Sequence, residues 1–99
     1  MTTASTRVVT VVLPGQLREL TGGEAQIVIE GAGGTVAALF LALRERHRSV
    51  YDRIFTEQGE VRPHVNVFVD GADIRWAGGL EATVGPSSEV LVLPAVSGG

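Results

Sequence analysis

The sequence offers few side chains that could form or break a covalent bond. None of its 99 residues is a cysteine or a lysine, and all eight basic residues are arginines. The chain therefore has no thiolate nucleophile, no disulfide, no cysteine-based metal site and no amine for Schiff-base chemistry. What remains is a main-chain group, the carboxylate of Gly99, which follows a second glycine, Gly98.

The other polar candidates are better explained as parts of the fold. His47 and His64 are far apart in the sequence, without a pattern of metal ligands around them. Asp70 and Asp73 belong to a predicted turn, where aspartate is favoured for backbone reasons. The glycine-rich stretch 31–34 lacks the spacing of a phosphate-binding loop. We therefore expect no catalytic residue, no metal site and no bound cofactor.

The end of the sequence has the composition of an exposed tail. The predicted final strand, Glu89–Leu93, is followed by Pro94, which we expect to end it. Small residues then lead to two glycines, whose lack of a Cβ atom would let the main chain enter a narrow channel. The segment predicted to thread into a partner protein consists of Ala95, Val96, Ser97, Gly98 and Gly99.

Composition limits the class of protein. An apolar fraction of 44% in 99 residues is typical of one small globular domain. The net charge of −3 argues against nucleic-acid binding, and the apolar runs are too short to span a membrane. The N-terminus lacks the features of a signal peptide, so we expect a cytoplasmic protein. Residues 1–6 are predicted to be disordered, 7–94 to form the domain, and 95–99 to be a flexible tail.

Alternation and β-branched residues predict a sheet. The expected strands are Arg7–Leu13, Ala25–Glu30, His64–Val69, a brief Ile74–Trp76, and Glu89–Leu93. The first and last strands are the most continuously apolar, which places both in the middle of the sheet. In the third strand, Phe68 should face away from the valines that alternate with it.

One main helix is predicted between the second and third strands. Apolar residues recur at helical spacing from Val36 to Leu43, which indicates a helix over about 35–47 with Thr35 as its N-cap. A shorter helix is expected over Ser49–Phe55. A mixed sheet of four or five strands with one main helix on one face is an α+β arrangement. With the two terminal strands central, it describes a β-grasp.

The C-terminal third of the chain resembles a known family. Residues 93–99 (LPAVSGG) closely resemble the ending of the ubiquitin-like sulfur-carrier proteins of the ThiS/MoaD type. Upstream, HVNVFVDG at 64–71, DIR at 73–75, GGL at 78–80 and EV at 89–90 look like the branch that serves cysteine biosynthesis. Two departures are the sequence GPSS at 85–88, where the family usually has Asp-Gly-Asp, and Ser97, where this branch usually has alanine.

The resemblance implies a function for the tail. In this family, an adenylating enzyme of the ubiquitin-activating type uses ATP to convert the terminal carboxylate, here that of Gly99, into an acyl adenylate. A sulfur donor then displaces AMP and leaves a thiocarboxylate, which delivers its sulfur inside a partner biosynthetic enzyme. The resemblance thus implies a carrier rather than an enzyme, with catalysis supplied by partner proteins.

The resemblance also suggests a docking surface. It implies that the outer face of the sheet and Leu80 meet the partner, with Leu93 on the same side as Phe68. The alternative that Leu80 and Leu93 are ordinary core residues stays open at this point.

Several functions share this pattern. The sulfur could go to an enzyme of the cysteine synthase type, to the large subunit of molybdopterin synthase, to a thiazole synthase, or to an enzyme of specialised metabolism such as one that makes a thiosugar. The chain could instead be a ubiquitin-like modifier joined to other proteins through Gly99, although without lysine it cannot form lysine-linked chains on itself. A third possibility is a β-grasp interaction module whose Gly-Gly ending is incidental.

Overall fold

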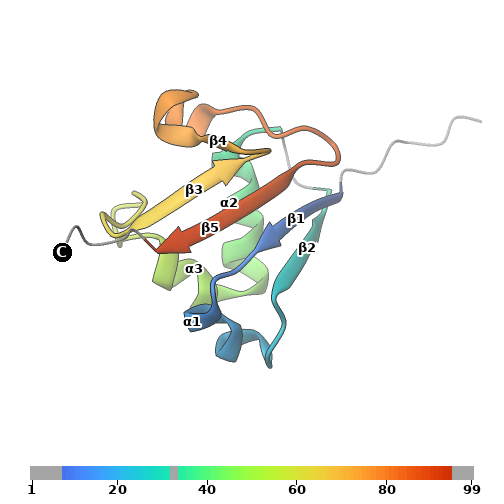
Figure 1. Cartoon of the computed structure of the whole chain (residues 1–99), viewed down its shortest axis with the longest axis vertical. Coiled ribbons are helices and arrows are strands. Elements are labelled where there is room, and N and C mark those ends of the chain that lie inside the picture. The colour runs from blue at the N-terminus through green and yellow to red at the C-terminus, as the bar shows by residue number, and fades with distance from the viewer. Residues whose placement is uncertain (1–7, 32–33, 95–99) are drawn as a thin grey trace, which may run out of the picture.

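The computed structural model describes residues 8–31 and 34–94, and Figure 1 shows their arrangement. The predicted disordered segment 1–6 and the predicted tail 95–99 lie outside these residues. The elements are β1 (Val8–Val12), α1 (Gly15–Arg18), η1 (Glu19–Thr21), β2 (Gln26–Glu30), α2 (Val36–Arg46), α3 (Arg48–Ile54), β3 (Val65–Val69), β4 (Ala72–Asp73), η2 (Ile74–Trp76), η3 (Gly79–Glu81) and β5 (Glu89–Pro94), where η denotes a 3₁₀ turn.

The strands form one mixed sheet in the order β2-β1-β5-β3-β4. Strand β5 pairs in parallel with β1 and antiparallel with β3, while β1–β2 and β3–β4 are antiparallel pairs. The first and last strands thus lie side by side inside the sheet, which Figure 1 shows with α2 and α3 behind it. This is the predicted ubiquitin-like β-grasp.

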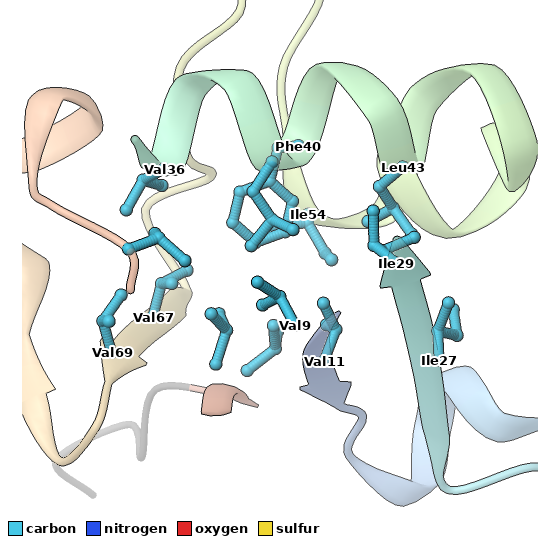
Figure 2. Close-up of a cluster of buried hydrophobic side chains, with 14 of the residues drawn as sticks. Val9, Val11, Ile27, Ile29, Val36, Phe40, Leu43, Ile54, Val67 and Val69 are labelled. Carbon is cyan, nitrogen blue, oxygen red and sulfur yellow. The ribbon is translucent and has the colours of Figure 1, made fainter. Parts of the chain in front are cut away.

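The core lies between the sheet and α2. Alternate residues of β1, β2, β3 and β5 point toward α2. The helix packs four side chains against them, each at most 1% exposed: Val36, Leu39, Phe40 and Leu43. Figure 2 shows Val36, Phe40 and Leu43 pointing down onto the strand side chains. The apolar positions predicted at helical spacing are therefore the buried ones, because the same stripe faces the sheet along the whole helix.

Both ends of α2 have identifiable signals. The Thr35 hydroxyl accepts a hydrogen bond from the Ala38 N–H at 3.2 Å, so Thr35 is the predicted N-cap. At the other end the backbone leaves the helical conformation at His47 and resumes as α3. Arg46 donates a hydrogen bond to the Glu30 carbonyl at 3.2 Å, which ties the end of the helix to strand β2.

One predicted strand is wrong. Ile74–Trp76 forms a 3₁₀ turn, and the partner of β3 is instead Ala72–Asp73. The Asp73 carboxylate accepts a hydrogen bond from the Arg75 N–H at 2.9 Å. This local bond gives the backbone an alternative to the strand ladder, and it turns the chain after only two paired residues.

The role predicted for Pro94 is also wrong in part. Pro94 is the last residue of β5, opposite Val65, and not the residue that follows the strand. At the other end of this ladder the Asp70 N–H donates to the Glu89 carbonyl at 2.8 Å. Counting along the antiparallel ladder from that pair, Pro94 occupies a position where the two strands exchange no hydrogen bond. Its missing N–H is therefore tolerated.

The turn after β3 is connected to the turn before β5. Asp70 has a left-handed backbone (φ 49°), as the first residue of a two-residue hairpin turn with Gly71. Its carboxylate accepts hydrogen bonds from the Glu89 N–H at 2.9 Å and from the Ser88 hydroxyl at 2.7 Å. The backbone N–H of Glu89, and then the Ser88 hydroxyl, lower the pKa of Asp70 because both stabilise the ionised carboxylate.

Candidate partner-binding face and exit of the chain

A single row of side chains crosses all five strands on the face opposite α2. The pairs Gln26–Val12, Val12–Leu91, Leu91–Phe68 and Phe68–Asp73 are each directly opposite across a strand boundary. Residues that are directly opposite point to the same face of a sheet. The middle of the row is apolar, with Leu91 of the central strand between Val12 and Phe68.

The apolar middle of this row belongs to a larger apolar surface, which we call the open face. It consists of Val12, Val28, Phe68, Leu91 and Leu93. Val28 is 52% exposed and Leu93 is 37% exposed, while the other three are half-buried among their neighbours. A contiguous apolar surface on a small protein marks a site of contact with another molecule, whereas scattered exposed apolar residues carry no such meaning.

A charged pair borders the open face beside Phe68. Asp73 is the cross-strand partner of Phe68, and its carboxylate binds the Arg75 guanidinium at 2.7 Å. The side-chain hydrogen bond from Arg75 is the main cause that lowers the pKa of Asp73, and it raises the pKa of Arg75 in turn. Next to it, Trp76 is 84% exposed, with the Arg75 guanidinium carbon 6.0 Å from its ring centre. The border of the open face therefore carries an exposed aromatic ring as well as the charged pair.

The described chain ends at the edge of this face. Leu93 and Pro94 are the last two residues of β5, and both are exposed. With Pro14, Leu17 and His64 they help to line a mainly apolar cavity of about 200 Å³ at this end of the sheet. The predicted threading segment, Ala95–Gly99, follows directly, outside the described residues. The open face and the exit of the chain thus adjoin.

The structure places two of the three predicted docking residues on the open face and the third at its border. Phe68 and Leu93 share the open face, because Leu93 has the same parity along β5 as Leu91, the partner of Phe68. Leu80 lies in η3, beyond the β3 edge, where it is partly buried against the core. It lines a cavity on the helical side together with Leu41 of α2. Leu80 also lines a cavity of about 280 Å³ with Asp73 and Arg75, the charged pair that borders the open face.

The polar candidates form no catalytic cluster in the described residues. His47 caps α2, and His64 is an exposed residue just before β3. Within residues 8–31 and 34–94, no three His, Cys, Asp or Glu side chains are close enough together to bind a metal ion. Over the same ranges, no helix has the length and apolar character needed to cross a lipid bilayer.

Sequence reasoning missed several members of this site. Leu91 and Val12 were treated only as parts of apolar strands, although the parity that selected Phe68 also selects them. Val28 could have been found from its alternation with two buried isoleucines. No signal was available for Trp76, because its exposure depends on a turn that the sequence pattern read as a strand.

Taken together, fold and surface define a class. The chain is a ubiquitin-like β-grasp domain with an apolar open sheet face, and its central strand leads into a Gly-Gly ending. The family model for the ThiS family matches residues 11–99. The chain therefore belongs to the ThiS family, and its predicted likeness to ubiquitin-like sulfur carriers is confirmed.

Individual relatives agree with this placement. The sulfur carrier protein CysO of Mycobacterium tuberculosis (strain ATCC 25618 / H37Rv) is 32% identical over 93 residues, which cover 92% of this chain and 98% of that protein. A chain in the crystal structure of the Amycolatopsis orientalis BexX/CysO complex is 38% identical, with a TM-score of 0.78 and coverage of 92% of this chain and 99% of that one. The predicted likeness to the cysteine-biosynthesis branch is thus supported by two CysO relatives.

A second kind of relative is a protein modifier. The solution structure of the small archaeal modifier protein 1 (SAMP1) from Methanosarcina acetivorans is 30% identical, with a TM-score of 0.75 and coverage of 95% of this chain and 98% of that one. The family that includes this chain therefore contains both sulfur carriers and ubiquitin-like modifiers. The BexX/CysO complex also indicates that sulfur carriers of this kind bind partner proteins.

Proposed function

We propose that this chain carries sulfur as a thiocarboxylate on Gly99 and delivers it to a biosynthetic enzyme. An adenylating enzyme joins the Gly99 carboxylate to AMP from ATP, with release of pyrophosphate. A sulfur donor then displaces AMP, and the C–S bond formed replaces the C–O bond to the nucleotide. The chain is a cosubstrate in these steps, and it binds no cofactor of its own.

The family match carries this proposal, because it runs through the last residue and so includes the Gly-Gly ending. The composition supports it independently. Without a cysteine, the chain cannot hold sulfur as a persulfide, which leaves the C-terminal carboxylate as the attachment point. The open face adjoins the exit of the chain at Leu93, so a partner that binds this face would have the tail beside it.

The direct test is the intact mass of the chain after incubation with ATP, a cognate adenylating enzyme and a sulfide source. The expected gain equals the replacement of one oxygen by sulfur, located on Gly99 by fragmentation. A variant with tryptophan appended after Gly99 should gain nothing, because the added side chain blocks a narrow channel. The Ser97→Ala variant, which restores the residue usual in the cysteine branch, is the control and should react like the wild type.

Two results would oppose the proposal. One is thiocarboxylation at the new end of the extended variant, which would refute the narrow-channel argument. The other is an unchanged mass with every adenylating enzyme encoded by the same genome. The acceptor is expected to be of the cysteine synthase type, given the CysO relatives. Sulfur transfer to that enzyme, compared with transfer to a molybdopterin or thiosugar synthase, tests this choice.

A modifier function is the second candidate, favoured by the likeness to SAMP1. The activation step would be the same, but the activated Gly99 would be joined to an amine of another protein. Covalent adducts of higher mass in the same incubation, lost on deletion of Gly98 and Gly99, would support it. Thiocarboxylate formation without any adduct would favour the carrier.

A further inference from the structure

The helical side of the molecule has a groove of its own. Exposed Leu41 of α2 and partly buried Leu80 of η3 line an apolar cavity of about 260 Å³, which Tyr51 and Phe55 also line. The rings of Tyr51 and Phe55 are stacked, with centres 4.8 Å apart and planes within 2° of parallel. Leu41 is 54% exposed, so this groove presents a large aliphatic side chain next to a rigid aromatic pair.

A basic cleft continues from this groove. Tyr51 and Phe55 also line a cleft of about 660 Å³, together with Arg44, Arg48 and Arg62. Arg44 lies over the Tyr51 ring, at 5.7 Å from its centre, and makes no hydrogen bond within the described part of the chain. Its N–H donors therefore face solvent beside the aromatic surface, in the arrangement that binds carboxylates.

The acidic residues of the cleft only partly offset its arginines. Asp52 and Glu57 line the same cleft. The Asp52 carboxylate already accepts a hydrogen bond from Arg48 at 3.2 Å, and its main-chain carbonyl accepts one from Arg62 at 3.0 Å. Arg44 and the outer nitrogens of Arg62 are thus available to another molecule, in a chain whose net charge is −3.

We propose that this groove and cleft form a second docking surface, which binds an acidic amphipathic segment of a partner protein. The apolar part fits the side chains of such a segment, and its carboxylates would meet Arg44 and Arg62. The two parts share the Tyr51–Phe55 pair, so the ligand must carry apolar and anionic groups side by side. A small inorganic anion could bind the arginines of the cleft but would leave the apolar groove empty.

The surface is separate from the one proposed for sulfur transfer. The helices lie on the opposite side of the sheet from the open face, as Figure 1 shows. A protein bound to the open face would leave this groove accessible, so the chain could contact two proteins at once. The inference therefore does not depend on thiocarboxylation, and its test uses no adenylating enzyme.

The test is an NMR titration of the ¹⁵N-labelled full chain with a synthetic peptide that alternates Glu-Glu pairs with Leu and Phe, capped at both ends. The amide signals of α2, α3 and η3 should shift, while those of the open face should not. Binding should weaken strongly in about 1 M salt, where charges are screened within about 3 Å. Peptides with Lys in place of Glu, or with Ser in place of Leu and Phe, should not bind.

Matched variants locate the site. Arg44→Glu and Leu41→Ser should each weaken binding roughly tenfold, as expected for a central interface contact. Arg53→Glu, on α3 but outside the cleft, and Val28→Ser, on the open face with a similar exposure to Leu41, should bind like the wild type. Circular dichroism of each variant establishes that it is folded.

Three outcomes would overturn the proposal. One is the absence of any shift at about 1 mM peptide, which would mean a binding free energy weaker than about −4 kcal/mol. Another is a loss of binding in Val28→Ser that equals the loss in Leu41→Ser. The third is a shift of the same amides on raising the protein concentration without peptide, which would identify a second copy of the chain as the occupant.

Discussion

Phe68 on β3 lies directly opposite Leu91 on β5, on the face of the sheet turned away from α2. The pair occupies the middle of the row that crosses all five strands, with Val12 on one side and the Asp73–Arg75 pair on the other. Leu91 is also two positions along β5 from Leu93, the next residue of this strand on the same face. An aromatic residue that is half-buried at the centre of an apolar surface is a common anchor of a protein interface.

The Phe68→Asp variant should therefore bind the adenylating enzyme at least roughly tenfold more weakly than the wild type, as the loss of such an anchor implies. Isothermal titration calorimetry measures this change. Val28→Asp is the matched control, because Val28 is exposed on the same face but lies on β2, three strands from β3. Equal losses in both variants would mean that the docking surface is not centred on Phe68.

The stability of the fold should depend on the ionisation of Asp70. Its pKa is lowered from 3.8 in the folded chain by the Glu89 N–H and the Ser88 hydroxyl, so ionised Asp70 stabilises the fold above the unfolded-state pKa. This contribution is lost as the pH falls through the lowered folded-state value. Urea denaturation from pH 7 down to acid should show stability decreasing in this range. Asp70→Asn, which tolerates the left-handed backbone, should show a smaller decrease.

Ser88→Ala gives an independent check of the same contact. It removes the second of the two donors to Asp70, so its dependence on pH should lie between those of the wild type and Asp70→Asn. It also removes the acceptor of the Gly85 N–H, 2.7 Å from the Ser88 hydroxyl, which should lower stability at neutral pH as well. A Ser88→Ala profile parallel to that of the wild type would show that the backbone donor alone controls Asp70.

Truncation of Phe40 should be the most damaging change in α2. Its side chain is 1% exposed and its ring centre lies 4.9 Å from that of Phe55, so Phe40→Ala leaves a large cavity under the helix. We expect a loss of about 3–5 kcal/mol in the free energy of unfolding, measured by urea denaturation. Leu41→Ala, at the next position but exposed, should cost no more than about 0.5 kcal/mol. Similar costs for both would contradict the assigned core face.

The stability of the fold should depend on the N-cap of α2, and a second substitution at the same position should restore the lost stability. Thr35→Ala removes the acceptor of the Ala38 N–H and should cost about 1 kcal/mol of stability. Thr35→Asn supplies another side-chain acceptor and should recover most of the loss. If the asparagine variant is as unstable as the alanine variant, then Thr35 acts through its packing or its bridge to Thr83 and not as a cap.

The sequence predicted the parts of the fold that depend on periodicity. Two patterns predict which side chains face the core: the apolar stripe from Val36 to Leu43 and the alternation around Phe68. Burial of these side chains is what favours this fold over others. The β-grasp followed from the apolar character of the two terminal strands. These features are local in sequence or repeat at a fixed period, so they can be read without coordinates.

The errors fall where a single hydrogen bond decides the backbone. Asp73 redirects the chain into a turn at Ile74–Trp76, and the register of the β3–β5 ladder allows Pro94 inside a strand. Neither effect has a period that a pattern can detect. A related reason explains why the open face was only partly found. Alternation within one strand identified Phe68 and the family resemblance suggested Leu93, whereas Val12 and Leu91 join them through pairing between distant strands.

The position of β5 between β1 and β3 has a mechanical consequence. A partner that pulled on the chain beyond Pro94 would load β5 along its axis, where Val90 and Leu91 pair with both β1 and β3 and the following residues pair with β3 alone. Such a force would act on the hydrogen bonds of the ladder in shear, along the strand, and would not pull the strand sideways out of the sheet. The direction in which β5 runs thus means that tension applied at Pro94 would act within the plane of the sheet.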